Sequence, residues 1–125
     1  MTQENKELLL KDLCARIPYG VKMNHIADNE HSPKTLIGVA KDMITLKGLG
    51  GYECVDVEHY KPYLFPLSSM TEEQKREREA HFTCMKHDMS FSICRYMEWC
   101  YKNHLDINGL IPKGFAIDAT GLNIY

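Results

Sequence analysis

The sequence predicts an α+β fold: an N-terminal helix, a small curled antiparallel sheet or SH3-like barrel, and a C-terminal helical pair. Three observations predict it: amphipathic periodicity near the N-terminus, short β-rich runs up to Leu67, and helix-start signals beyond that residue. A chain of 125 residues has the length of one ordinary domain. We therefore expect a single domain over 1–125, with a helix and β-rich half in 1–67 and a helical half with a possible terminal strand in 68–125.

The first helix is predicted over residues 3–17. Leu9, Leu13 and Ile17 recur at i, i+4 and i+8 and therefore share one helix face. Pro18 ends the helix because its ring excludes a further helical hydrogen bond.

The β-rich region consists of the runs "GVKMNHI", "KTLIGVAKDMITLKG" and "YECVDVEHYKPYLFPL". Turn-forming residues separate the runs, among them Asp28, Pro33 and Gly50. Three to five short strands in about fifty residues are too few for a sandwich, but they suffice for a small curled sheet or an SH3-like barrel.

A charged helix is predicted after Pro66. Thr71 with Gln74, or Ser69 with Glu72, has the spacing of a capping box. The following "TEEQKREREA" carries almost no apolar residue, which indicates a helix surrounded by solvent.

The second helix of the C-terminal pair is predicted over residues 90–104. Its charged residues, Arg95, Glu98 and Lys102, form one narrow stripe, and the rest of its surface is apolar, aromatic, thiol or small. Such a helix is expected to be packed on most sides, so we expect it to form the buried centre of the helical half. In the tail, "GFAIDA" is a possible extra strand.

Composition disfavours several functional classes. The chain carries 15 Lys and Arg against 17 Asp and Glu, a net charge of -2, spread evenly over both halves, so nucleic-acid binding is not favoured. No stretch approaches the roughly 20 apolar residues of a membrane span, and the N-terminus lacks the basic start and apolar run of a signal peptide. Five cysteines fit reduced thiols, so a cytoplasmic location is expected. The oligomeric state is left open.

Cys84, His87, Cys100 and His104 form a C-x2-H-x12-C-x3-H array. Its spacing matches a zinc finger with the second and third ligand types exchanged, which zinc tolerates. A finger also needs a β-hairpin before its helix, and the sequence preceding this array is helical in pattern. We favour buried core thiols at these positions and keep a zinc-stabilised module as an alternative.

Five aromatic residues of the β-rich half form a candidate partner-binding edge. Such an edge on a small barrel binds extended or proline-rich peptides, while the plainer interpretation is packing of the strand against the helices. The candidate residues are Tyr19, Tyr52, Tyr60, Tyr63 and Phe65.

The chain contains no nucleotide-binding or hydrolase motif, and no catalytic residue or cofactor is predicted. The first turn of the second C-terminal helix, "SFSIC", lacks the base-reading side chains of a helix-turn-helix. The sequence therefore predicts a non-catalytic module that binds an unidentified protein or peptide. The alternatives are a zinc-stabilised or weak nucleic-acid-binding module and a small enzyme of unrecognised type.

Three segments, "LLLKDLCARIPYGVK", "YKPYLFPLSSMTEEQ" and "HLDINGLIPKGFAIDA", resemble a family of small uncharacterised proteins from Bacteroides-type gut bacteria and their mobile elements and phages. The resemblance covers both ends and the middle of the chain. It implies a cytoplasmic bacterial protein and brings no activity or site residue with it. The shared positions look structural: a helix end at Pro18, a strand exit at Pro66, a capped helix at Thr71 and a turn at Gly109.

Overall fold

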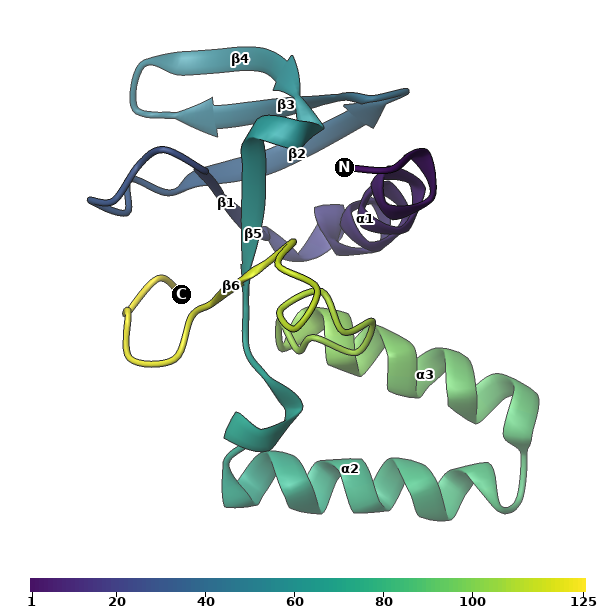
Figure 1. Ribbon diagram of the computed structural model, residues 1–125. Coiled ribbons are helices and arrows are strands. Elements are labelled where there is room, and N and C mark those ends of the chain that lie inside the picture. Colours follow the sequence, from purple (N-terminus) through teal and green to yellow (C-terminus); the bar gives the residue numbers. More distant parts are fainter.

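A computed structural model describes all residues, 1–125, and has the predicted α+β fold (Figure 1). The helices are α1 (Gln3–Arg16), α2 (Glu72–Met85) and α3 (Met89–Lys102), with short 3-10 turns at Ile17–Tyr19, Val57–His59 and Leu67–Ser69. The strands are β1 (Lys22–His25), β2 (Lys34–Ala40), β3 (Met43–Gly48), β4 (Gly51–Asp56), β5 (Tyr60–Leu64) and β6 (Ile117–Asp118).

The strands form one open, mixed sheet in the order β4-β3-β2-β1-β5-β6. Strands β1 to β5 pair antiparallel, and the predicted extra strand in the tail, β6, pairs parallel to β5. Because β4 and β6 lie at opposite ends of this order, the sheet does not close, and the SH3-like barrel alternative is not confirmed. A register shift between Leu36 and Gly38 interrupts the β2–β3 pairing, as a β-bulge does.

The main core lies between α1 and one face of the sheet. Leu9 and Leu13 of α1 are fully buried, as are Leu46 of β3 and Leu64 of β5. The predicted periodicity of α1 is thus confirmed, because the leucines spaced four residues apart face the sheet together.

A buried ion pair joins α1 to the chain that follows α3. Arg16 Nε donates to Asp12 Oδ2 at 2.7 Å, and both side chains are completely buried. Arg16 Nη2 also donates to the carbonyl oxygen of Leu105 at 2.7 Å, and its guanidinium lies 4.9 Å from the centre of the Tyr101 ring. Asn108 Nδ2 donates to Asp12 Oδ1 at 2.8 Å. This network holds the C-terminal end of α3, and the loop that follows it, against α1.

The C-terminal residue closes over the β5 side of the sheet. The Tyr125 hydroxyl donates to the carbonyl oxygen of Tyr63 at 2.7 Å and accepts from the backbone N–H of Lys22 at 2.9 Å. The Tyr125 ring stacks on the His104 imidazole with centroids 3.6 Å apart. Burial, helped by the nearby Arg16 charge, lowers the pKa of His104 to about 4. His104 is therefore uncharged at neutral pH.

The variant His104→Asn is expected to reduce the acid sensitivity of the fold. The His104 pKa is about 4 in the folded state and about 6.5 when unfolded, so the unfolded state binds the proton first as pH falls. Wild-type stability is then lost progressively from about pH 6.5 to about pH 4. Asparagine suits the left-handed backbone at this position, where φ is 57°. Urea unfolding across this pH range measures the effect, and parallel wild-type and variant curves would contradict it.

Candidate functional site

Helices α2 and α3 form a hairpin that projects from the body of the protein (Figure 1). No residue of α2 is buried, and α3 buries only Ser92 and Cys100. The expectation that α3 is the buried centre of the helical half is therefore wrong. One face of α3 meets α2 and its C-terminal end meets α1, while its N-terminal half lies open to solvent.

Both helices of the hairpin begin at side-chain caps. Thr71 Oγ1 accepts from the backbone N–H of Gln74 at 3.1 Å, and Gln74 Oε1 accepts from the backbone N–H of Thr71 at 3.0 Å. The first of the two predicted capping boxes is thus confirmed. Asp88 caps α3 by accepting from the backbone N–H of Phe91 at 3.5 Å. These caps support helices that gain little from burial.

Aromatic contacts hold the two helices together. The rings of Phe82 and Tyr96 lie 5.1 Å apart, and those of His81 and Trp99 lie 5.5 Å apart. Trp99 Nε1 also donates to Glu77 Oε2 at 2.6 Å, which links α3 back to α2. Burial raises the pKa of Tyr96 to about 12, so its hydroxyl stays protonated. Such aromatic pairs fix the separation of the helices.

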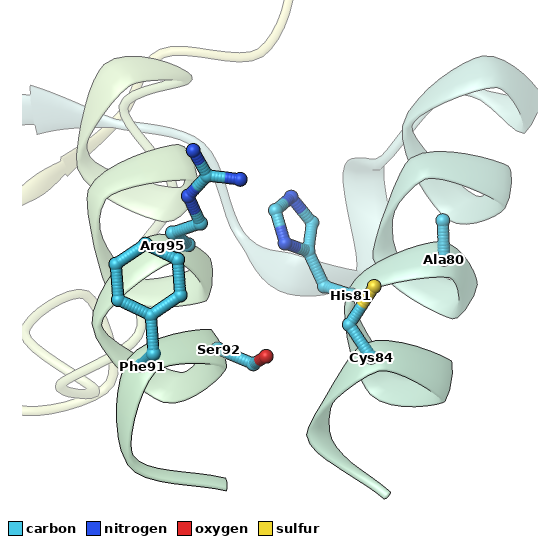
Figure 2. A pocket seen from close by; sticks show the side chains of 6 residues that line it. All are labelled: Ala80, His81, Cys84, Phe91, Ser92 and Arg95. Carbon is cyan, nitrogen blue, oxygen red and sulfur yellow. The ribbon is translucent and has the colours of Figure 1, made fainter. Parts of the chain in front are cut away.

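A groove of about 340 Å³ opens between the helices next to this aromatic contact. Figure 2 shows its two walls: the α2 side chains lie on one side and the α3 side chains on the other, with His81 opposite Arg95 and Cys84 opposite Ser92. The space exists because several facing side chains are too small to fill it. This hairpin groove is lined by Ala80, His81, Cys84, Phe91, Ser92 and Arg95.

Large apolar side chains of the hairpin are exposed, and one of them, Phe91, lines the groove. Met89 is 62% exposed, Phe91 60%, Ile93 45% and Phe82 36%. Large exposed apolar side chains beside a concave site often mark a surface for interaction.

The comparisons with known proteins gave no match. No family model, no curated protein and no solved structure is similar to this chain. The functional argument therefore rests on the hairpin itself.

The residues of the predicted metal array are not brought together. Cys84 lines the hairpin groove and His87 is exposed in the turn between the helices, whereas Cys100 is fully buried and His104 stacks on the C-terminal tyrosine. No group of three or more His, Cys, Asp or Glu side chains is placed to hold a metal ion. Helical backbone replaces the β-hairpin that a finger needs. The favoured interpretation, buried core thiols, holds for Cys100 and is wrong for Cys84, which is exposed.

The predicted aromatic edge is not formed as one exposed cluster. Tyr52 on β4 is 66% exposed, but Tyr60 and Tyr63 on β5 are buried, at 6% and 0%. Because they lie three positions apart on β5, an odd offset, Tyr60 and Tyr63 point to opposite faces of the strand. Tyr19 and Phe65 are half-buried. Of the five candidate residues, only Tyr52 is freely accessible to a partner. Partner binding through these aromatic residues stays a prediction.

The sequence reasoning missed the hairpin groove, although a signal for it was present. An apolar helix was predicted next to a helix with almost no apolar residue, and a charged helix cannot cover an apolar one. The exposed side chains of Met89, Phe91 and Ile93 are the result. None of the three helices is long and apolar enough to cross a membrane.

Proposed function

We propose that the protein is a non-catalytic interaction module that binds a partner protein through the hairpin groove. One observation carries the proposal: a concave, largely apolar groove lies on a projecting helical hairpin, and Phe91 at its wall is 60% exposed. Concave apolar sites with a few polar groups are where binding energy concentrates.

The chemistry of the hairpin groove supports binding rather than catalysis. Nucleophilic catalysis needs a base that a third group orients. His81, the only imidazole lining the groove, makes ring contacts with Tyr96 and Trp99 at 5.9 and 5.5 Å and forms no side-chain hydrogen bond. The His81 imidazole, held by contacts with two aromatic rings, is suited to forming part of the surface that a partner packs against.

The dimensions support a small interface. A groove of about 340 Å³ lies at the lower end of ligand-site volumes and accommodates a large apolar side chain. A site that holds one anchor side chain suits a transient complex, which buries less than about 1,200 Å² in total. None of the five cysteines forms a disulfide, which supports assigning the protein to the cytoplasm. The three resembling sequence segments support assigning it to the bacterial family named above.

Site-specific photocrosslinking in cells tests the proposal. A photoreactive phenylalanine analogue is placed at Met89, which is 62% exposed at the start of α3, or at Ile37 on β2, which is 40% exposed and distant in the fold. We expect a discrete crosslinked protein from position 89 and none from position 37. Equal crosslinking at both positions, or none at position 89, would show that the hairpin is not the binding surface.

The variant Phe91→Ser separates binding from folding. Because Phe91 is 60% exposed, its loss is expected to change the free energy of unfolding by no more than about 0.5 kcal/mol. The crosslinking yield from position 89 is expected to fall at least about tenfold, the scale of a lost hot-spot contact. Urea unfolding provides the stability measurement, and unchanged crosslinking in a folded variant would contradict the assignment of Phe91.

A further inference from the structure

We propose that the occupant of the hairpin groove is an amphipathic helix of the partner protein. It inserts a large apolar side chain between α2 and α3 and places carboxylates against Arg95 and Arg76. This inference rests on the proposed function and specifies the chemistry of the partner.

The shape of the groove determines what enters it. Cys84 on α2 lies opposite Ser92 on α3, so two small side chains leave space between the walls, while His81, Arg95 and Phe91 stand around it (Figure 2). A side chain of the size of leucine or phenylalanine fills such a space, and burying it contributes on the order of 1.5–3 kcal/mol. The groove therefore selects a partner with a projecting apolar anchor.

The backbone of the hairpin determines that the anchor is carried by a helix. An extended peptide binds by adding hydrogen bonds to a free strand edge. Between their ends, α2 and α3 use their backbone groups internally, so they offer no such edge. A third helix lying along the groove instead packs apolar residues spaced i, i+4 and i+7 against both walls.

Arginine side chains without an ion-pair partner indicate that the partner helix carries carboxylates. Arg95 lines the groove and lies 4.9 Å from the Phe91 ring, and Arg76 precedes Ala80 by one helical turn on the same face of α2. Neither arginine takes part in any of the ion pairs of the protein.

Two carboxylates of the hairpin are engaged: Glu77 accepts from Trp99 and Asp88 caps α3. Glu98 follows Arg95 by one helical turn on the charged stripe of α3 but forms no ion pair with it. The Arg95 guanidinium at the groove wall is therefore available to pair with a partner carboxylate in bidentate geometry.

Other occupants fit this surface less well. A second copy related by a two-fold axis presents the same patch, so Arg76 and Arg95 of one copy face the like charges of the other. A lipid surface matches the charges but leaves a concave groove unfilled. Nucleic acid needs a continuous basic surface to follow its phosphates, whereas α2 alternates four glutamates with Lys75, Arg76 and Arg78.

Selection from a displayed library of helical peptides tests the inference. The probe is a library of peptides of about 14 residues, four turns of helix, presented to the full-length protein. We expect enriched peptides to share apolar residues at i, i+4 and i+7 flanked by Asp or Glu, with Kd values on the order of micromolar. Titration calorimetry with the best peptide measures affinity.

Charge exchange provides the decisive control. Arg95→Glu is expected to weaken the best peptide at least about tenfold, and changing the opposing peptide carboxylate to lysine is expected to restore most of the loss. Lys41→Glu, an exposed lysine in the β2–β3 turn, serves as the matched control and is expected to change affinity less than about twofold. Arg95→Gln removes the charge without reversing it. It serves as the second test variant if Arg95→Glu does not fold, and it is expected to weaken the peptide in the same direction.

Several outcomes would overturn the inference. The proposal of an acidic partner helix is contradicted if the selection enriches basic peptides or enriches none. It is also contradicted if Arg95→Glu leaves peptide binding unchanged. Phe91-dependent dimerisation in sedimentation assigns the surface to a second copy, and Phe91-dependent binding to anionic phospholipid vesicles assigns it to a membrane. If position 89 crosslinks to a protein while the selection fails, the inference is wrong and the proposed function stands; if neither succeeds, both fail.

Discussion

Replacing Asp12 with alanine is expected to lower the free energy of unfolding by about 3–5 kcal/mol, because it leaves a buried guanidinium without its counter-ion. Arg16 and Asp12 are fully buried, with Arg16 Nε 2.7 Å from Asp12 Oδ2 and Arg16 Nη2 3.1 Å from Asp12 Oδ1. The carboxylate also accepts from Asn108, and that donor loses its partner as well. Urea unfolding at neutral pH measures the change.

Two controls isolate the buried charge. The double variant Asp12→Leu, Arg16→Met removes both charges and is expected to be less destabilised than Asp12→Ala alone, since apolar replacements of buried pairs are often nearly neutral. Glu72→Ala breaks the exposed pair with Lys75 on α2 and is expected to cost less than about 1 kcal/mol. A loss below about 1 kcal/mol for Asp12→Ala would mean that water reaches Arg16.

The Asp12–Arg16 pair also bears on the proposed function. Arg16 donates to the Leu105 carbonyl oxygen and lies against Tyr101 near the end of α3. The hairpin meets the body through this end of α3, so the pair sets the direction in which the groove points. A side chain of α1 thereby positions a surface that lies on other elements.

Local signals predicted much of the fold. The leucine spacing of α1, the capping box at Thr71 and the stop at Pro18 each depend on neighbours within four residues, and each is read directly from the sequence. The sheet stays open at the β5 side because β6, and not β4, pairs with β5, and these two strands lie more than fifty residues apart in sequence. No local pattern encodes such pairing, which explains why a barrel was considered.

The candidate site was harder to predict because composition suggests burial but does not supply the covering partner. Phe91 and Ile93 read as core residues, yet α2 buries no residue of its own against α3 and leaves both exposed. Likewise, the i, i+4 spacing of Asp12 and Arg16 is equally suited to an exposed helix face, and the contacts with Leu105 and Asn108 after α3 accompany their burial. In both cases a segment distant in sequence decides exposure.

Replacing Asp106 with alanine is expected to lower the free energy of unfolding by about 2–4 kcal/mol, because two backbone donors lose their acceptor at a buried site. Asp106 is 6% exposed, and its carboxylate accepts from the backbone N–H of Leu110 at 2.8 Å and of Ile111 at 2.9 Å. These bonds close the turn that contains Gly109, whose φ is 69°. Urea unfolding again gives the magnitude.

The matched control is Asp106→Asn, which keeps one of the two acceptor oxygens and is expected to lose about half as much. Equal losses for Asn and Ala would show that charge, not acceptor number, matters. Asp106 directly follows Leu105, whose carbonyl oxygen binds Arg16, so both replacements disturb one loop. The effects of Asp12→Ala and Asp106→Ala are therefore expected to be less than additive, by at least about 0.5 kcal/mol, as for other residues that share a hydrogen-bond network. Strict additivity would mean that the ion pair and the turn hold this loop independently.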